Sequence, residues 1–159
     1  MRKILIFGNS GSGKTTIAKK LCVELGSVHL DLDILAWQPT SPPERRLLSE
    51  SQIEINRFID SNESWVIEGC YSDLLELAAS KSNEIIFMNL PIDDCIANAK
   101  ERPWEPHKYE SKEAQDANLE MLINWITQYS IRTDTFSESA HKELYEKYSG
   151  KKTMLSSNE

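Results

Sequence analysis

The sequence is poor in cysteine and has no long apolar segment. Its three cysteines are far apart, odd in number and in no metal-ligand spacing, so we expect reduced thiols at Cys22, Cys70 and Cys95. No apolar run approaches the ~18 residues that a membrane-spanning helix needs. The apolar run near the start covers only residues 4–7 before Gly8, which is too short for a signal peptide. These absences predict a cytoplasmic protein with no membrane partner.

Positive charge is also scarce. Lysine and arginine total 18 against 25 aspartate and glutamate, which gives a net charge of −7. Binding to duplex nucleic acid needs clustered lysine and arginine, so this balance argues against a nucleic-acid partner. A local basic pocket for a small phosphorylated ligand remains compatible with it. The length of 159 residues and the 40% hydrophobic content predict a single domain, residues 1–159.

The sequence does contain a phosphate-binding motif. Gly8 is separated by four residues from Gly13-Lys14-Thr15, and the motif directly follows the apolar run. In such a loop the glycines let the backbone approach phosphates, successive N–H groups face the anion, and the lysine reaches the β- and γ-phosphates. The threonine hydroxyl is a ligand for Mg²⁺. The expected nucleotide-binding residues are Gly8, Asn9, Ser10, Gly11, Ser12, Gly13, Lys14, Thr15 and Thr16.

Short apolar runs alternate with helical patterns along the chain. The predicted strands cover residues 4–7, 28–30, 65–67 and 85–88, with a weaker fifth candidate at 152–155. The predicted helices cover residues 17–25, 44–61, 72–78, 93–101, 111–129 and 137–148. This alternation predicts an α/β three-layer sandwich with a five-stranded parallel sheet. Ligands of such sheets bind at the carboxyl ends of the strands.

Several helix details follow from the same patterns. Ser41 before Pro42 fits an N-cap and first-turn pair for the helix at 44–61, and Ser72 is expected to cap the helix at 72–78. The inward-facing residues expected for the helix at 44–61 are Leu48, Ile55, Phe58 and Ile59. The inward stripe expected for the helix at 111–129 is Ala114, Ala117, Met121, Leu122, Trp125 and Tyr129.

Several classes of phosphate-loop protein do not fit. The guanine-reading sequence Asn-Lys-x-Asp of switch GTPases is absent, as is the Gly-rich signature of transporter ATPases. Motor and unfolding ATPases usually carry an acidic pair after a core strand, whereas the fourth predicted strand ends in Met88-Asn89-Leu90. Small-molecule kinases remain, and they fit the length.

The chain resembles the nucleoside-monophosphate kinase superfamily in its order of elements over nearly its whole length. It is most similar to shikimate-kinase-like proteins and to the adenylate-kinase-related "DNA topology modulation" proteins. Besides the phosphate loop, the resemblance rests on His29-Leu30-Asp31-Leu32-Asp33, Trp37-Gln38-Pro39, Trp65-Val66-Ile67-Glu68-Gly69-Cys70-Tyr71 and Ile131-Arg132-Thr133-Asp134. Shikimate kinases carry Gly-Gly-Gly where this chain has Glu68-Gly69-Cys70, so the resemblance does not extend to shikimate as the substrate. Arg45 and Arg46 are the candidates for an arginine that binds a substrate carboxylate.

The resemblance implies a P-loop kinase that uses ATP and Mg²⁺ to phosphorylate a small-molecule acceptor. Lys14 would hold the donor phosphates, and Thr15 and Asp31 would hold the metal. Asp33 would accept the proton of the acceptor hydroxyl, although the roles of the two aspartates could be exchanged. The acceptor-binding insertion would cover residues 34–62 and the lid residues 102–112. The sequence does not determine whether the donor is ATP or GTP. It also leaves open the identity of the acceptor and the oligomeric state.

Two arginines and several loop residues complete the expected site. Arg102 and Arg132 flank the lid at positions where the superfamily places arginines, so they are expected to stabilise charge on the transferring phosphoryl group. Residues expected to contact the acceptor are Asp33, Trp37, Gly69 and Tyr71. His107, Lys108 and Lys112 are interpreted as ordinary polar groups of the lid. The alternative function is an ATP-binding regulatory or sensor module with weak or no transfer.

Overall fold

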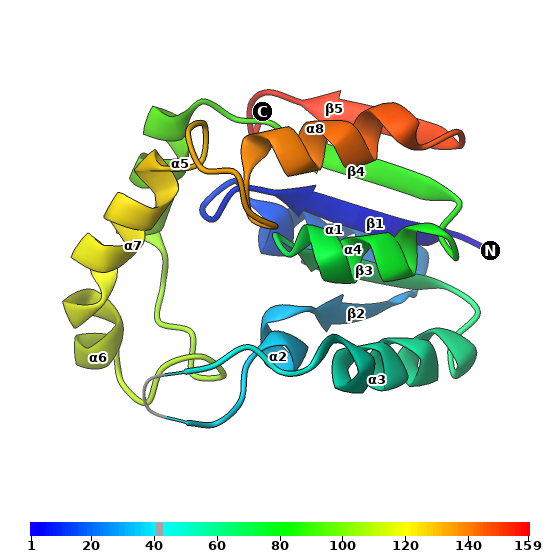
Figure 1. Ribbon diagram of the computed structural model, residues 1–159, viewed down its shortest axis with the longest axis horizontal. Coiled ribbons are helices and arrows are strands. Elements are labelled where there is room, and N and C mark those ends of the chain that lie inside the picture. The colour runs from blue at the N-terminus through cyan, green and yellow to red at the C-terminus, as the bar shows by residue number, and fades with distance from the viewer. Residues whose placement is uncertain (41–42) are drawn as a thin grey trace.

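Five strands form one parallel sheet in the order β2-β3-β1-β4-β5 (Figure 1). The computed structural model describes residues 1–40 and 43–159. The strands are β1 (Lys3–Gly8), β2 (Val28–Asp31), β3 (Trp65–Gly69), β4 (Glu84–Met88) and β5 (Lys151–Leu155). The predicted five-stranded parallel sheet is therefore confirmed, and it includes the weak fifth candidate.

Helices cover both faces of the sheet (Figure 1). They are α1 (Lys14–Leu25), α2 (Asp33–Ala36), α3 (Leu48–Asp60), α4 (Ser72–Ala79), α5 (Ile92–Glu101), α6 (Lys112–Ala117), α7 (Leu119–Thr127) and α8 (Glu138–Lys147). Side chains of α3, α4 and α8 pack on one face, and side chains of α1, α5 and α7 pack on the other. This arrangement is the predicted three-layer sandwich.

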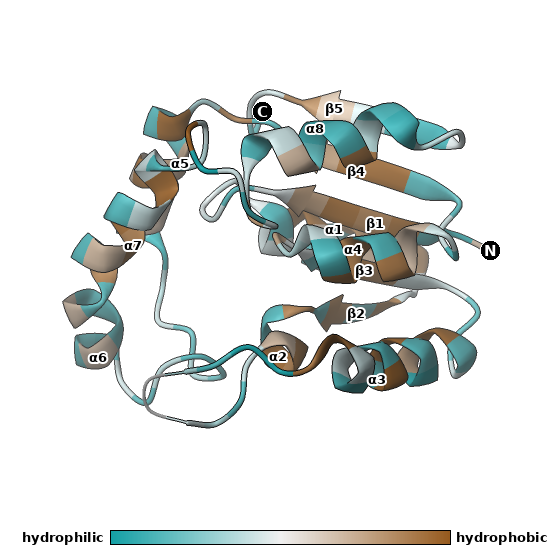
Figure 2. Cartoon of the chain, viewed as in Figure 1, coloured by the Kyte–Doolittle hydropathy of each residue, from teal (hydrophilic) through white to brown (hydrophobic). Residues whose placement is uncertain are grey.

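The central strand β1 explains why the core has two halves. Its side chains alternate between the faces, so that Leu5 and Phe7 contribute to one cluster while Ile4 and Ile6 contribute to the other. All four are fully buried. Figure 2 shows hydrophobic residues concentrated in β1 and β4, with hydrophilic residues over much of α8. A continuous apolar run is what a strand covered on both faces requires.

The prediction of one continuous helix at 111–129 is wrong in one respect. The helix is divided into α6 and α7 at Asn118, whose Nδ2 donates a hydrogen bond to the Tyr109 hydroxyl at 2.9 Å. The helix tightens at this point, because the Asn118 N–H is shared between the carbonyls of Ala114, at 3.3 Å, and Gln115, at 3.1 Å. The expected inward stripe is also only partly right, since Tyr129 is buried while Met121 is 70% exposed.

Three smaller predictions about helix ends and faces were also tested. The helix α3 begins at Leu48 rather than at residue 44, and Leu48 is exposed rather than inward, whereas Ile55 and Ile59 are buried. Ser72 is the first residue of α4 and not its cap; its hydroxyl pairs with Thr135 Oγ1 at 2.7 Å. The predicted cap Ser41 lies outside the described residues.

No helix in the described part of the chain is long and apolar enough to cross a bilayer.

Candidate active site

The phosphate loop joins β1 to α1 with backbone angles that require glycine. Gly11 has φ 79° and Gly13 has φ 90°, both in the left-handed region. A Cβ at Gly11 would lie 2.4 Å from the backbone carbonyl oxygen of Cys95, so a larger residue has no room there. The spacing of glycines in the motif therefore reflects both the turn and the close contact with α5.

Side chains from distant parts of the chain hold the loop in place. Asn98 of α5 donates hydrogen bonds to the Gly11 carbonyl and to Asn158 Oδ1, both at 2.8 Å. Asn158 in turn donates to the Ser12 carbonyl at 3.1 Å. Lys14 Nζ donates to the Asn9 carbonyl at 2.7 Å, so its ammonium lies across the loop. The two hydrogen bonds of Asn98 were not predicted from the sequence.

A buried carboxylate stands directly beside the loop. The Thr15 hydroxyl donates a hydrogen bond to Glu68 Oε2 at 2.5 Å, and His29 Nε2 lies 3.0 Å from the same oxygen. Glu68 is only 2% exposed. Burial acts to raise its pKa, but the hydrogen bond with His29, the charge of Lys14 and the Thr15 bond together hold the pKa of Glu68 below its usual value. Glu68 is therefore an ionised acid beside the threonine of the motif.

Glu68 was not predicted as a site residue, because the expected position of an acid was the end of the fourth strand. However, β1 also pairs with β3, and Glu68 lies opposite Ile6 in that pairing. The available signal was the acid in Glu68-Gly69 directly after the apolar run Trp65-Val66-Ile67. The strand order, which is not readable from local pattern, makes this signal meaningful.

The two predicted aspartates follow β2 and lie together. Asp31 Oδ1 accepts a hydrogen bond from the Asp33 backbone N–H at 2.9 Å, while Asp31 Oδ2 is buried without a hydrogen bond. Burial, Asp33 and Glu68 raise the pKa of Asp31. Burial also acts to raise the pKa of Asp33, but Lys108 and the hydrogen bond from the Tyr71 hydroxyl lower it overall. Asp33 is thus the more strongly ionised member of the pair.

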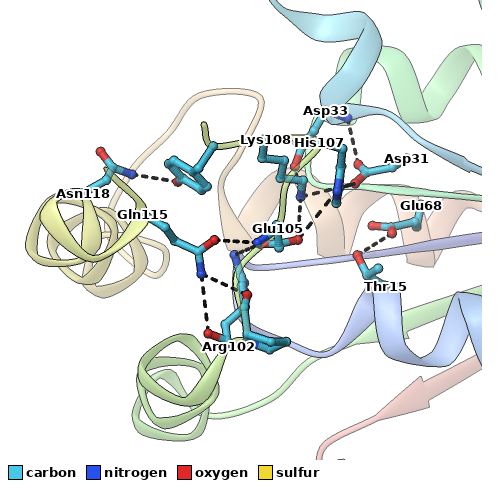
Figure 3. A network of polar contacts seen from close by, with 12 residues as sticks. Thr15, Asp31, Asp33, Glu68, Arg102, Glu105, His107, Lys108, Gln115 and Asn118 are labelled. Carbon is cyan, nitrogen blue, oxygen red and sulfur yellow. Dashed lines mark hydrogen bonds and ion pairs between the residues drawn. The ribbon is translucent and has the colours of Figure 1, made fainter. Parts of the chain in front are cut away.

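A lysine of the predicted lid contacts the two aspartates, Asp31 and Asp33, which together form the acidic group of the site (Figure 3). Lys108 Nζ lies 2.6 Å from Asp33 Oδ2, 3.2 Å from Asp31 Oδ2 and 3.6 Å from Glu105 Oε2. These three carboxylates raise the pKa of Lys108 although its burial opposes them. The interpretation of Lys108 as an ordinary polar group of the lid is therefore wrong. Lys112, which pairs with Asp116 at the surface, fits that interpretation.

A cavity of about 680 Å³ connects the phosphate loop, the acidic group and the lid. Residues of the phosphate loop and residues 102–108 both line it. The predicted site residues that line the cavity are Ser10, Gly11, Gly13, Lys14, Thr15, Thr16, Asp33, Gly69 and Arg102. The predicted phosphate loop, Asp33 and Arg102 therefore all line the same cavity.

Other predicted residues lie outside the cavity wall. Tyr71 is 3% exposed and joins Asp33 to Trp37, whose Nε1 donates to the Tyr71 hydroxyl at 2.9 Å. Arg132 pairs with Asp134 at 2.7 Å and stacks 3.6 Å from the centre of the Trp125 ring. The structure thus supports Tyr71 and Trp37 as neighbours of Asp33, while the catalytic role of Arg132 stays a prediction.

The two candidate arginines for an acceptor carboxylate differ in position. Arg45 lies 5.0 Å from the centre of the Tyr71 ring and pairs with Asp73 at 3.0 Å. Arg46 pairs with Glu54 of α3 at 2.9 Å. Only Arg45 is therefore placed near the Asp33–Tyr71 side of the site.

The site offers suitable ligands for Mg²⁺, although no group of three or more metal-binding side chains occurs in residues 1–40 and 43–159. Magnesium is usually held by one or two carboxylates together with waters and the phosphates of a nucleotide. The Thr15 hydroxyl, the Glu68 carboxylate and the buried Asp31 Oδ2 that has no hydrogen bond are such oxygens. These residues fit a magnesium ion that arrives with a nucleotide.

Comparison with solved structures shows the fold. A shikimate kinase from Bacteroides thetaiotaomicron superposes with a TM-score of 0.51 at 18% identity and covers 91% of this chain and 97% of its own. The protein TT1252 from Thermus thermophilus gives 0.56 at 15% identity, with 98% and 88% covered. A deoxyadenosine kinase from M. mycoides with bound dATP gives 0.50 at 14% identity, with 98% and 91% covered.

Comparison of sequences identifies the family. The curated relative YqaC of Bacillus subtilis, described as an uncharacterized protein, is 28% identical over 109 residues. That match covers 65% of this chain, and the chain spans 58% of the length of the relative. A family model described as "AAA domain" matches residues 4–120. The chain therefore belongs to this AAA domain family.

Proposed function

We propose that the protein is an ATP-dependent kinase that phosphorylates a small-molecule acceptor. The observation that carries this proposal is the shared cavity, in which Lys14 and Thr15 of the phosphate loop face Asp33 and the segment 102–108. Phosphoryl transfer depends mainly on positioning and on neutralising charge, and a cavity that joins a phosphate cradle to an ionised acid supplies both.

On the donor side, the loop amides and Lys14 would bind the β- and γ-phosphates of ATP. Thr15, Glu68 and Asp31 are the residues that would hold Mg²⁺, which neutralises charge on the phosphate oxygens when bound. Because Glu68 is buried and ionised, it can accept a hydrogen bond from Thr15 or from a water on the metal. Arg102 lines the same cavity, where its guanidinium would stabilise the transferring group.

On the acceptor side, Asp33 would orient the acceptor hydroxyl and accept its proton. The bond from Tyr71 fixes one oxygen of Asp33, and Trp37 fixes Tyr71 in turn. Gly69 lines the cavity next to Cys70, where a side chain would meet Leu32. Arg132 would act only if the segment before α8 approached the cavity on closure. The acceptor is a small molecule, and the size of the cavity supports that class.

A regulatory nucleotide-binding module is the second candidate. It is favoured by one observation, namely that both carboxylate oxygens of Asp33 already have partners, Tyr71 and Lys108. Burial acts to raise the pKa of Asp33, but these two partners lower it overall, so Asp33 is a weak base for a hydroxyl proton until one partner moves. A sensor of this kind would bind ATP without turnover and would bind a partner protein differently in its ATP and ADP states.

The test is a screen for ADP release stimulated by an acceptor. Shikimate and nucleoside monophosphates belong in the panel together with nucleosides, because two solved neighbours are named shikimate kinase and deoxyadenosine kinase. The proposal expects one acceptor class to stimulate turnover in the wild type, and none to do so in Lys14→Ala. The matched control Lys20→Ala removes an exposed lysine of the same helix and should behave as wild type. Tight ATP binding without stimulation by any acceptor would favour the regulatory module.

A further inference from the structure

The acidic group beside the phosphate loop already contains a cation that belongs to the chain itself. Lys108 approaches it from the segment between α5 and α6 and contacts both Asp33, at 2.6 Å, and Asp31, at 3.2 Å (Figure 3). Its side chain is only 20% exposed. Residues 102–108 of the segment that carries Lys108 line the cavity, so this contact holds the segment against the acidic group.

The group needs a cation because its carboxylates lie close together and Asp31 among them is buried. Asp31 is 8% exposed, and Asp33 and Glu68 both act on it with negative charge. Buried ionised carboxylates are stable only when an opposite charge accompanies them. In the described residues, the other basic side chain within 4 Å of Asp31 is His107, whose Nε2 lies 3.9 Å from Asp31 Oδ2. Lys108 is therefore the charge that balances the aspartate pair.

The balance provided by Lys108 is incomplete. Asp31 Oδ2 is buried and lies 3.2 Å from the ammonium, yet it makes no hydrogen bond. Asp33 Oδ2, by contrast, is at 2.6 Å from the same nitrogen. Lys108 thus binds Asp33 well and leaves one oxygen of Asp31 without directional contact. A buried acceptor of this kind is satisfied by a metal ion or by a water bound to one.

We infer that Lys108 is a built-in counter-cation, and that Mg²⁺ displaces it from Asp31 when nucleotide binds. The inference rests on the proposed binding of ATP with Mg²⁺, and it adds a link between the metal and the lid. While Lys108 contacts Asp31, the segment 102–111 is held against the acidic group. When Mg²⁺ neutralises Asp31, the attraction between Lys108 and Asp31 is lost. The Lys108 ammonium then contacts Asp33 alone or moves into the cavity. The two cations are therefore alternatives at Asp31.

The test measures metal binding without nucleotide, so it does not depend on catalysis. Free Mn²⁺ is measured by electron paramagnetic resonance in the presence of the wild type, Lys108→Met and the matched control Lys112→Met. Lys108→Met should acquire a Mn²⁺ site at least about tenfold tighter than any site of the wild type, a difference of about 1.4 kcal/mol. Lys112→Met should equal the wild type, since Lys112 pairs with Asp116 at the surface. The double variant Lys108→Met with Asp31→Asn should lose the new site.

Thermal unfolding gives a second readout on the same proteins. The unfolding midpoint of Lys108→Met should fall without divalent ions and recover in MgCl₂, relative to NaCl of equal ionic strength. Lys108→Gln is the second variant in case the methionine disturbs packing. The inference is overturned if the folded variants bind no more Mn²⁺ than the wild type, or if neither variant folds in MgCl₂. Failure of the wild type to bind ATP with Mg²⁺ would instead remove the proposed function and leave the Mn²⁺ result standing.

Discussion

Thr15 at the start of α1 and Glu68 at the end of β3 are joined by a hydrogen bond of 2.5 Å. The two residues are 53 positions apart in the chain. They meet because β1 and β3 are neighbouring parallel strands, and their carboxyl ends lie at the same edge of the sheet. This contact places an ionised acid where the motif places its metal-binding hydroxyl.

The first prediction concerns Glu68. Glu68→Gln keeps the shape and removes the charge, so it should lower turnover by about 10²-fold, the scale seen when one preorganised electrostatic group is lost. The affinity for ATP with Mg²⁺ should fall more than the affinity for ATP in EDTA, because the lost charge acts on the metal. Titration with fluorescent ATP in both buffers measures this difference. Equal losses in both buffers would show that Glu68 supports the loop and not the metal.

Much of this fold could be predicted from local pattern, and the candidate site only in part. Apolar runs in Ile4-Leu5-Ile6-Phe7 and Ile85-Ile86-Phe87-Met88 are short and continuous, so they indicate buried parallel strands without any tertiary information. The phosphate loop is equally local, since its glycines, lysine and threonine all lie within residues 8–15. These features explain why the sheet was predicted correctly and why the phosphate loop could be located in the sequence.

The residues that were missed depend on tertiary pairing. Glu68 matters because β3 lies beside β1, and Lys108 matters because its loop folds back over Asp31 and Asp33. Lys108 leaves no local signal, whereas Glu68 leaves one, the acid directly after an apolar run, whose meaning depends on the strand order. The break at Asn118 was also not predicted.

The second prediction concerns Asp33. Asp33→Asn should abolish stimulated ADP release while it preserves ATP affinity, because the amide cannot accept the proton of an acceptor hydroxyl. Asp60→Asn, at the exposed end of α3, is the control and should retain activity. Single-turnover assays and ATP titrations separate transfer from binding. If Asp33→Asn folds but loses ATP affinity, the metal role belongs to Asp33 and the acceptor role to Asp31.

The third prediction compares two glycines with similar backbone angles. Gly11 has φ 79° and a Cβ there would lie 2.4 Å from the Cys95 carbonyl oxygen, whereas Gly26 has φ 65° and open space around it. Gly26→Ala should cost only the backbone strain of about 1–2 kcal/mol and should keep ATP binding. Gly11→Ala should cost more and should abolish ATP binding, because the loop must move away from α5. Urea unfolding and ATP titration measure both effects, and equal behaviour of the two variants would contradict the prediction.

The fourth prediction concerns the pH dependence of stability through His141. This residue is fully buried; Nε2 donates to the Cys70 carbonyl at 2.8 Å, so Nδ1 accepts from the Tyr129 hydroxyl at 2.7 Å. Burial, helped by the charge of Lys14, lowers the pKa of His141 to about 4, although the bond to Cys70 opposes it. The unfolded chain has an ordinary histidine pKa of about 6.5, so below that pH the unfolded state binds more protons.

The stabilising effect of a neutral His141 is therefore fully present above about pH 6.5 and is lost as the pH falls toward 4. The loss should reach roughly 2–3 kcal/mol at pH 4.5. His141→Gln removes this titration, so its free energy of unfolding should fall less between pH 7 and pH 4.5 than that of the wild type. His107→Gln, whose side chain is 44% exposed, is the control and should keep the wild-type difference. Urea unfolding of the three proteins at both pH values measures the six free energies of unfolding, and identical pH dependence in wild type and His141→Gln would show that carboxylates alone cause the acid sensitivity.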